Sequence, residues 1–406
     1  MSTLSDVRVL EFAGEIGSYA GKLYAELGAD VIHIEPPEGD PVRFEWPFYK
    51  DMPNRETSLK YLYQNTNKRD LVLDIRKEEG KEIFLKLIKT VDILIESFPP
   101  GYLEQLGLGY EQLKKENPRL VHASITPFGQ EGPYRDYPAS DLTLAALGGF
   151  LYLAGAGDDK PARAYGEQSY MQGMMYAAVG TMAALYDAEE TGEGQFIDVS
   201  MQACVATALE FAAQQWDLEK TIRRAGAGVW AGTGVYRCKD GYVYTMFTMG
   251  NNAYLWDPLP KWLKDEGEEE GAAILGTEEW RKLEYKTTDE AKKIFREIFG
   301  RFAAKHEKLY LYEESQRRRC VCYPISDPKD VYENPQLNYR RFFIPLHHEH
   351  LGGEVYYPGQ TCYIEKMPYE IKPAPTFGQH TKEILEELGY SSEQVEALKE
   401  RGVIVG

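Results

Sequence analysis

The 406-residue sequence has few cysteines, no long apolar run and no leader-like start. Its five cysteines are odd in number and irregularly spaced, which favours reduced thiols over a disulfide framework. No apolar segment approaches the length that crosses a bilayer. The start, MSTLSDVRVLEF, lacks the basic region and apolar run of a signal peptide. We therefore expect a soluble, cytoplasmic protein that does not enter a membrane.

Basic residues are scarce relative to acidic ones. The sequence has 46 lysines and arginines against 64 aspartates and glutamates, a formal net charge of −18. This excess of negative charge argues against nucleic acids and anionic membranes as partners. It still allows a local basic pocket that holds a phosphorylated ligand.

Patterns typical of metal sites are weak. Cys320 and Cys322 form C-x-C with no second pair, and the run HHEH at 347–350 lies between two strand-like segments, FFIPL and GGEVYYPG. Adjacent histidines on a strand point to opposite faces, so they are poorly placed to share an ion. We expect no metal.

Apolar strand patterns alternate with amphipathic helix patterns in the N-terminal part of the chain. The helix-like segments are GEIGSYAGKLYAELG and EEGKEIFLKLIKT. The strand-like segments are VRVLEF, ADVIHIE, LVLDI, VDILIES and LVHASI, followed later by FIDVSM. Continuous apolar strands separated by helices indicate parallel β-α-β units in a sheet that is covered on both faces.

The pattern changes near residue 217. A glycine-rich segment, RRAGAGVWAGTG, precedes the hairpin pattern VYRCKDGYVYTMF, in which Asp240-Gly241 suits a tight turn. The tail predicts two short helices, the second capped by Ser391 or Ser392. We expect an α/β fold with a large domain from 1–219 and 321–406 and a small α+β domain inserted at 220–320.

Two local patterns suggest phosphate binding. Gly14, Gly17 and Gly21 follow a strand, and Glu35 ends the next one, as in dinucleotide-binding folds. The spacing G-x-x-G-x-x-x-G departs from G-x-G-x-x-G, so a tight β-α turn is the favoured interpretation. The run NTNKRD at 65–70 offers amides and two cations, which suit a phosphate but also occur in solvated loops.

The segment 161–180, PARAYGEQSYMQGMMYAAVG, lacks aspartate, cysteine and histidine. Its candidate nucleophiles and acids are Glu167, Ser169 and Tyr170. Asp141, at the start of an earlier apolar helix, is either a helix cap or a functional acid, and local sequence favours the cap.

Several segments that span nearly the whole chain match one known family in order. They are VRVLEF…LGADVIHIEPPEGD, NTNKRDLVLDI, VDILIESFPPGYLEQLGLGYEQLKKENPRLVHASITPFGQEGP, AALYDAEETGEGQFIDVSMQ, YRCKDGYVY and PISDPKDVYENPQL…FF…GQHTKEILEELGY. On these segments the chain resembles the family III CoA-transferases. The resemblance implies a Rossmann-like large domain, a small domain and two chains that interlock as a dimer.

The resemblance also implies a reaction. The family moves CoA from an acyl-CoA donor to a carboxylic acid through an aspartate, which forms a mixed anhydride and then an aspartyl-CoA thioester. A glycine loop, here near Gly226, Gly228 and Gly232, closes over the site and limits hydrolysis. CoA or acyl-CoA is the expected ligand, and its implied contacts are Asn65, Thr66, Asn67, Lys68, Arg69, Ser97, Phe98, Tyr137 and Ser140.

The chain departs from the family at the nucleophile. The family aspartate lies ten residues before a glycine that matches Gly180, which places it on Tyr170, or on Ser169 after a shift of one. A phenol with a pKa of about 10 is mostly neutral and would give a less labile ester. Two further departures are Gln105, in place of an arginine, and His33, in place of a strand cation.

Three hypotheses follow. The leading one is a subunit of a CoA-transferase whose homologous, aspartate-bearing partner completes an interlocked heterodimer or heterotetramer. We expect succinyl-CoA as donor and benzylsuccinate as acceptor, in anaerobic breakdown of aromatic compounds. The second is a homodimeric CoA-transferase or CoA-dependent isomerase that uses Glu167 or Asp141. Isomerase chemistry by a His–Asp pair is disfavoured because no histidine lies between residues 123 and 305. The third is a non-enzymatic acyl-CoA-binding protein.

Overall fold

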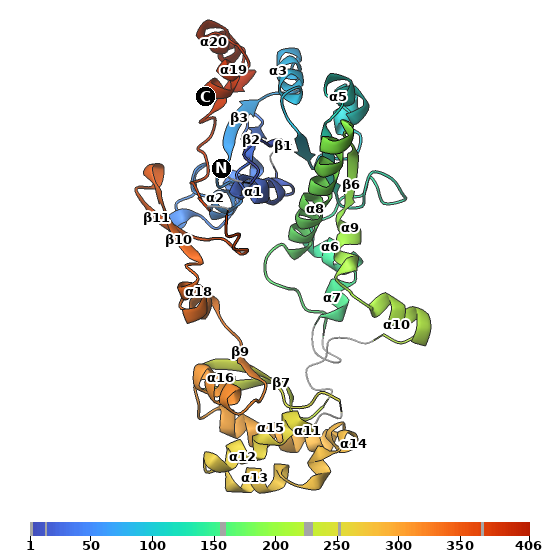
Figure 1. Cartoon of the computed structure of the whole chain (residues 1–406), viewed down its shortest axis with the longest axis vertical. Helices are drawn as coiled ribbons and strands as arrows, with labels where there is room; N and C mark the ends of the chain where they lie inside the picture. The colour runs from blue at the N-terminus through green and yellow to red at the C-terminus, as the bar shows by residue number, and fades with distance from the viewer. Residues whose placement is uncertain (1–2, 13, 155–159, 223–229, 251–252, 367–368) are drawn as a thin grey trace. The chain divides into compact units, whose positions relative to one another are not determined.

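The computed structural model describes residues 3–12, 14–154, 160–222, 230–250, 253–366 and 369–406. The chain divides into two compact units (Figure 1). The larger unit consists of Met1–Phe150, Ala164–Glu210 and Gln336–Gly406, and the smaller unit of Leu151–Arg163 and Phe211–Pro335. The smaller unit thus extends beyond the expected 220–320 at both ends.

The larger unit is built on a mainly parallel sheet. Its strands are β1 (Arg8–Phe12), β2 (Asp30–Glu35), β3 (Arg69–Leu73), β4 (Ile93–Glu96), β5 (Val121–Thr126), β6 (Phe196–Ser200) and β12 (Ile404–Val405). Among the described residues they run in the order β12-β3-β2-β1-β4-β5-β6. The strands β1 to β6 confirm the sequence prediction and pair in parallel. The sequence pattern did not indicate β12, which pairs antiparallel with β3 at the edge.

Helices surround this sheet. In the larger unit they are α1 (Ser18–Glu26), α2 (Leu59–Gln64), α3 (Glu78–Ile88), α4 (Tyr102–Gln105), α5 (Tyr110–Glu116), α6 (Asp141–Leu147), α8 (Gln168–Thr191), α9 (Met201–Thr207), α19 (Thr381–Glu387) and α20 (Ser392–Glu400), with the 3-10 turns η1 (Pro41–Phe44), η2 (Tyr49–Asp51) and η4 (Glu349–Leu351). Ser391 caps α20 in a capping box with Gln394, as the sequence predicted.

Both faces of the sheet are buried, which explains why its strands are apolar throughout. Val9 and Ile93 point to one face and share a core with α1, α8 and α9. Leu10 and Leu94 point to the other face and share a core with α3, α5, α19 and α20. The alternation follows from the two-residue repeat of a strand.

Small residues allow α8 to pack closely against its neighbours. A Cβ atom on Gly173 would lie 2.6 Å from Met201 Cγ, so α9 approaches the α8 backbone directly. The Tyr24 hydroxyl of α1 donates a hydrogen bond to the Ala178 carbonyl at 2.7 Å. The other side of α8 carries exposed apolar side chains, among them Val179, 70% exposed, and Tyr186, 69% exposed.

The smaller unit has its own aromatic core. Its antiparallel sheet consists of β7 (Thr233–Cys238), β8 (Gly241–Met246) and β9 (Cys322–Pro324). Its helices are α10 (Ala212–Glu219), α11 (Ala253–Trp256), α12 (Pro258–Asp265), α13 (Glu269–Leu275), η3 (Glu278–Arg281), α14 (Leu283–Lys286), α15 (Asp289–Ala303), α16 (Lys308–Arg317) and α17 (Pro328–Tyr332). The Trp256 and Trp280 rings stack 5.3 Å apart. The predicted hairpin is present, but its two-residue turn is Lys239-Asp240 because Cys238 pairs with Gly241.

Two further helices, α7 (Phe150–Leu153) and α18 (Pro335–Tyr339), span the points where the chain passes between the units. The second predicted hairpin consists of β10 (Phe343–His348) and β11 (Gly353–Pro358), which pair antiparallel. Within the described residues, no helix combines the length and the apolar character that a membrane crossing requires.

Candidate functional site

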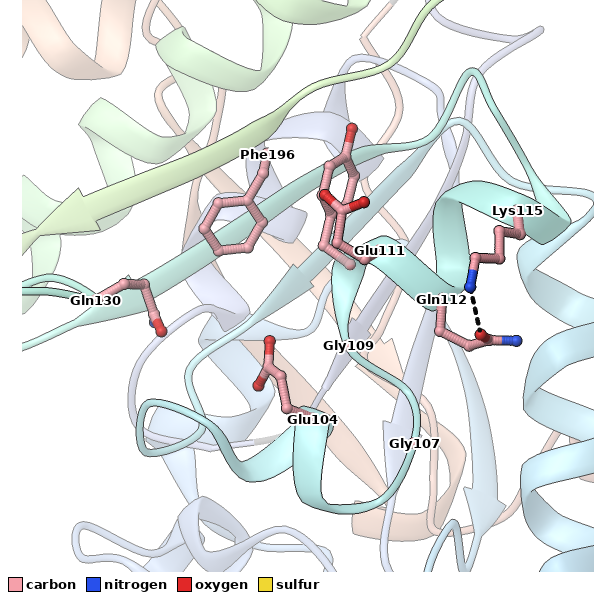
Figure 2. A pocket seen from close by; sticks show the side chains of 9 residues that line it. Glu104, Gly107, Gly109, Glu111, Gln112, Lys115, Gln130 and Phe196 are labelled. Atoms are coloured by element: carbon pink, nitrogen blue, oxygen red, sulfur yellow. Dashed lines mark hydrogen bonds between the residues drawn. The ribbon is translucent and has the colours of Figure 1, made fainter.

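Two cavities open in the larger unit. One of about 610 Å³ lies beside β6 and α5, and the expected CoA-binding residues do not line it (Figure 2). Another of about 950 Å³ is lined by Asn67, Lys68 and Arg69 together with the HHEH run at 347–350. The fold therefore brings together two basic runs that are far apart in the sequence. Within this cavity wall, His348 Nε2 lies 3.0 Å from the Tyr357 hydroxyl.

The position of the family aspartate lies in the first turn of α8. Ser169 and Tyr170 are 2% and 5% exposed, so both side chains belong to the core. Burial raises the pKa of Tyr170 to about 12, and the charges of Glu15 and Asp141 add to the effect. The phenol is therefore neutral at physiological pH and is a poor nucleophile there.

Asp141 caps the start of α8 from another helix. Its Oδ1 accepts hydrogen bonds from the backbone N–H groups of Ser169 at 2.7 Å and Tyr170 at 3.2 Å. The Ser169 hydroxyl also donates to the Asp141 carbonyl at 2.9 Å. Glu167, the residue preceding α8, provides no side-chain cap of its own. The cap of α6 itself is Ser140, not Asp141, so the predicted cap is present but serves a different helix.

Replacing Asp141 with alanine will lower the free energy of unfolding by about 1–2 kcal/mol, because α8 loses its N-terminal acceptor. Asp141→Asn will cost less, since its amide oxygen still accepts a hydrogen bond. Urea denaturation followed by circular dichroism measures both. Asp187→Ala, near the other end of α8, is the control and will change stability by less than about 0.5 kcal/mol. Equal losses for Asp141→Ala and the control would contradict the capping role.

Glu167 is held in an ion-pair cluster around Lys60. Lys60 Nζ lies 2.8 Å from Glu167 Oε1 and 2.6 Å from Glu45 Oε2. Glu15 is farther, at 4.0 Å, and burial together with a hydrogen bond to Glu45 raises its pKa. Burial alone would lower the pKa of Lys60, but its hydrogen bonds to Glu167 and Glu45 raise it. The sequence carried no signal for Lys60, because its partners come from three separate segments.

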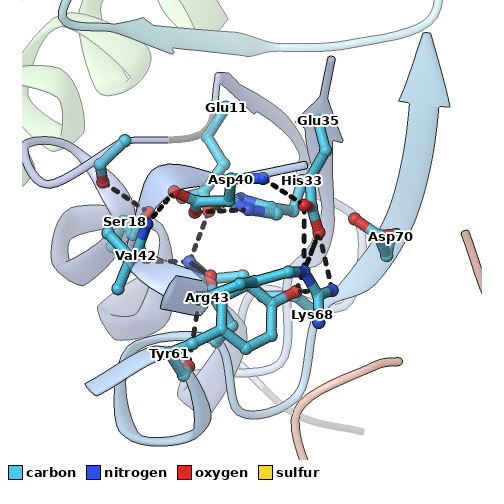
Figure 3. Close-up of polar contacts among 12 residues, drawn as sticks. Glu11, Ser18, His33, Glu35, Asp40, Val42, Arg43, Tyr61, Lys68 and Asp70 are labelled. Carbon is cyan, nitrogen blue, oxygen red and sulfur yellow. Dashed lines mark hydrogen bonds and ion pairs between the residues drawn. The ribbon is translucent and has the colours of Figure 1, made fainter. Parts of the chain in front are cut away.

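Lys68 lies inside a buried polar network rather than in solvent (Figure 3). Its Nζ donates to Glu11 Oε1, to the Ser18 carbonyl at 2.6 Å and to Asn65 Oδ1 at 2.9 Å. Burial lowers the pKa of Lys68 despite the nearby charge of Glu11. Asn65 and Thr66 are also fully buried. This part of the expected CoA segment therefore supports the fold from within.

Arg69 is the more accessible cation of this segment. Its guanidinium pairs with Asp30 at 2.7 Å, Glu387 at 2.6 Å and Glu383 at 3.1 Å. These pairs tie β3 to β2 and α19. Asn67 likewise bonds the backbone of the C-terminal segment, donating to the Glu370 carbonyl at 2.8 Å.

His33 joins two carboxylates in the same network. Its Nδ1 lies 2.7 Å from Glu11 Oε1 and its Nε2 lies 3.2 Å from Asp40 Oδ2. Burial alone would lower the pKa of His33, but the hydrogen bonds to Asp40 and Glu11 raise it to about 10. His33 is therefore a buried cation, like the residue it replaces in the family.

Glu35 is occupied by a buried ion pair, which favours the tight-turn interpretation of the glycine cluster over dinucleotide binding. Arg43 Nη2 lies 2.6 Å from Glu35 Oε1, and both side chains are fully buried. Burial would raise the pKa of Glu35, but the hydrogen bond from Arg43 lowers it to about 2. Beside the pair, burial and the charge of Glu35 raise the pKa of Asp70 well above its usual value.

Gly21 makes room for Glu11. A Cβ atom at Gly21 would lie 1.6 Å from Glu11 Oε2, so any side chain there displaces the carboxylate. We expect Gly21→Ala to lower the free energy of unfolding by about 1–3 kcal/mol through this overpacking. Gly180→Ala is the matched helical control, because its Cβ would meet only Ile197 Cγ2 at 3.6 Å. It will stabilise α8 by about 0.5–1 kcal/mol. Chemical denaturation of both variants tests the difference, which fails if the two effects have the same sign.

The remaining expected residues lie at separate places. Phe98 packs between Phe12 and Tyr102, with ring centroids 4.9 and 4.7 Å away. Ser97 donates to the Ile16 carbonyl at 2.7 Å, and Tyr137 is exposed. Gly226 and Gly228 lie outside the described residues. In the smaller unit, a Cβ on Gly232 would lie 2.8 Å from Trp256 Cζ3, so only glycine fits there.

The comparison with known proteins decides the family. The model of CoA-transferase family III matches residues 4–381. The chain belongs to CoA-transferase family III. This family III chain is 42% identical over 402 residues to the succinyl-CoA:(R)-benzylsuccinate CoA-transferase subunit BbsE of Thauera aromatica, with 98% of each chain covered. It is therefore a CoA-transferase chain, and CoA thioesters are the substrates of its family.

Two further relatives of this family III chain agree. The beta subunit of succinyl-CoA–L-malate CoA-transferase from Chloroflexus aurantiacus is 28% identical, with 99% of this chain and 98% of the relative covered. A crystal structure of a CAIB/BAIF family protein from Brucella suis aligns with a TM-score of 0.83 and 25% identity, over 95% and 99% of the two chains. The predicted α/β fold class is confirmed.

Proposed function

We propose that this chain is the subunit without the catalytic aspartate in a heteromeric CoA-transferase. The complex moves CoA from succinyl-CoA to benzylsuccinate or a closely related acid. A homologous partner chain supplies the aspartate. The pairing is an interlocked heterodimer or a heterotetramer built from such dimers.

The start of α8 carries the proposal. Its first turn presents a neutral, buried phenol where the family nucleophile is expected. The nearby acids already have partners, because Asp141 caps α8 and Glu167 pairs with Lys60. An attacking carboxylate has to be free to approach a thioester carbon, and neither group is free in this arrangement.

The relatives support the heteromer and its substrates. The 42% identical relative is named as one subunit of a succinyl-CoA:(R)-benzylsuccinate CoA-transferase, and the malate enzyme's relative is named as a beta subunit. The exposed apolar side of α8, with Met175, Tyr176, Val179 and Tyr186, supports a partner contact. Exposed apolar patches of this kind are typical of protein interfaces.

The proposed chemistry takes place on the partner's aspartate. That carboxylate attacks the thioester carbonyl of succinyl-CoA, and the thiolate of CoA leaves. The thiolate then attacks the aspartyl carbonyl of the mixed anhydride and releases succinate. The acceptor carboxylate next attacks the aspartyl thioester, and the released thiolate takes the acceptor's acyl group, which regenerates the aspartate. The glycine loop, with Gly226, Gly228 and Gly232, would exclude water during these steps.

The expected CoA contacts remain part of the proposal. Phe98 and Tyr137 offer rings on which adenine could stack, and Ser140 offers a hydroxyl. Lys68 and Arg69 are engaged by carboxylates of the chain, so phosphate binding would require them to exchange partners. This requirement makes binding at the partner's site the stronger expectation.

Expression of the chain alone, and together with its aspartate-bearing homologue, tests the proposal. We expect transfer from succinyl-CoA to benzylsuccinate only with both chains present. Hydroxylamine trapping of the enzyme–CoA thioester, followed by mass mapping, will label the partner and not this chain. Robust transfer by this chain alone, with a label on Glu167 or Asp141, would overturn the proposal. So would a stable pair that binds CoA but never transfers it.

A further inference from the structure

Two buried polar groups lie close together on one face of the sheet without satisfying each other. The parallel register pairs Leu94 with His122 and Glu96 with Ser124, so the side chains of Glu96 and His122 point to the same face. Glu96 Oε1 lies 3.8 Å from His122 Nε2, beyond hydrogen-bonding distance. Glu96 and His122 are 5% and 2% exposed. Among the described residues, neither ring nitrogen of His122 has a hydrogen-bond partner.

This arrangement is costly as it stands. A buried carboxylate is stable only when a cation or several donors compensate it, and Glu96 receives one backbone N–H, from Phe98 at 2.6 Å. A buried imidazole with two unpaired nitrogens loses the hydrogen bonds it would make in water. Both groups border a recess of about 10 Å³, which is the space of a single water-sized group.

The recess is continuous with a larger cavity. Glu104, Gln130 and Phe196 line both the recess and the neighbouring cavity of about 610 Å³ (Figure 2). Gln130 donates its side-chain amide to Ser124 Oγ at 2.8 Å, which leaves its carbonyl oxygen as an acceptor. The space therefore has a narrow polar end and a wide outer part.

The outer part is aromatic and acidic. The rings of Tyr110 and Phe196 lie 5.5 Å apart, and the Phe196 ring meets His122 edge-on at 5.1 Å. Glu104 and Glu111 border the opening, and neither forms an ion pair or hydrogen bond among the described residues. An organic cation with an apolar body fits this combination of carboxylates and rings.

We propose that this recess and cavity bind a small primary amine, with its ammonium group in the recess. An ammonium group is about the size of the recess and carries three N–H donors. They match Glu96 Oε1, one nitrogen of neutral His122, and Glu104 or the Gln130 carbonyl oxygen. The apolar body of the amine extends between Phe196 and Tyr110. A quaternary ammonium or a guanidinium is too large for the recess and has no comparable fit.

Calorimetric titration of the purified protein, in its complex if it requires one, tests the site with 2-phenylethylamine. We expect saturable binding that is about tenfold or more tighter than that of the N,N,N-trimethyl analogue or of 2-phenylethanol. Glu96→Gln and His122→Phe will each weaken binding about tenfold or more. Glu104→Gln is exposed and safe for folding, and it will weaken binding about fivefold.

The control is Glu116→Gln on the same helix, α5, where the carboxylate pairs with Lys89 away from the cavity. It will leave the affinity unchanged. Equal binding of the amine and its trimethyl analogue would overturn the site. No saturable binding up to about 10 mM would also overturn it and would leave the recess to one buried water. The site is independent of the proposed CoA transfer, so neither result bears on the other.

Discussion

Replacing the partner's nucleophilic aspartate with asparagine will lower kcat of the heteromer by about 10³-fold or more, whereas Tyr170→Phe in this chain will leave kcat within about threefold. The reason is that covalent catalysis fails entirely without its nucleophile, while a buried neutral phenol contributes no attacking group. Phenylalanine retains the packing of Tyr170 in the core around α8.

Glu167→Gln in the same complex provides the second arm of this experiment. The change removes one carboxylate from Lys60, which keeps Glu45 at 2.6 Å, so kcat will also stay within about threefold. Steady-state rates with succinyl-CoA and benzylsuccinate measure all three variants. A loss of 100-fold or more for Tyr170→Phe or Glu167→Gln would assign the chemistry to this chain and refute the division of labour.

Arg43→Met will lower the free energy of unfolding of this protein by about 3–5 kcal/mol. The guanidinium is fully buried and pairs with Glu35 at 2.6 Å and with Glu56 at 2.8 Å. It also lies over the Tyr61 ring, 3.7 Å from the centroid. Removing it leaves the Glu35 carboxylate as an uncompensated buried charge, which is the costly part of breaking such a pair.

A surface arginine supplies the matched control. Arg76 pairs with Asp74 at 2.7 Å and Glu38 at 2.9 Å but is 50% exposed, so Arg76→Met will cost less than about 1 kcal/mol. Adding Glu35→Gln to Arg43→Met will recover part of the loss, because it removes the stranded charge. Thermal and urea denaturation compare the variants. A cost for Arg43→Met no larger than that for Arg76→Met would show that the pair contributes little.

Local pattern was sufficient for most of the fold. The strands β1 to β6 are short apolar runs between amphipathic helices, and this periodicity depends only on near neighbours in the chain. Ser391, as the cap of α20, is equally local. β12 escaped prediction because two residues carry almost no periodic signal, and their strand exists only because β3 offers an open edge.

The sequence by itself determined the family and the absence of a carboxylate at Tyr170, because both depend on which residues occur and in what order. Only the tertiary structure decided what the remaining charged groups do. Asp141 caps a helix that begins 27 residues later, Lys68 turns inward to Glu11, and Glu96 faces His122 across a narrow recess. Such partnerships depend on distances of a few ångströms between side chains, and the fold sets these distances between segments far apart in the chain.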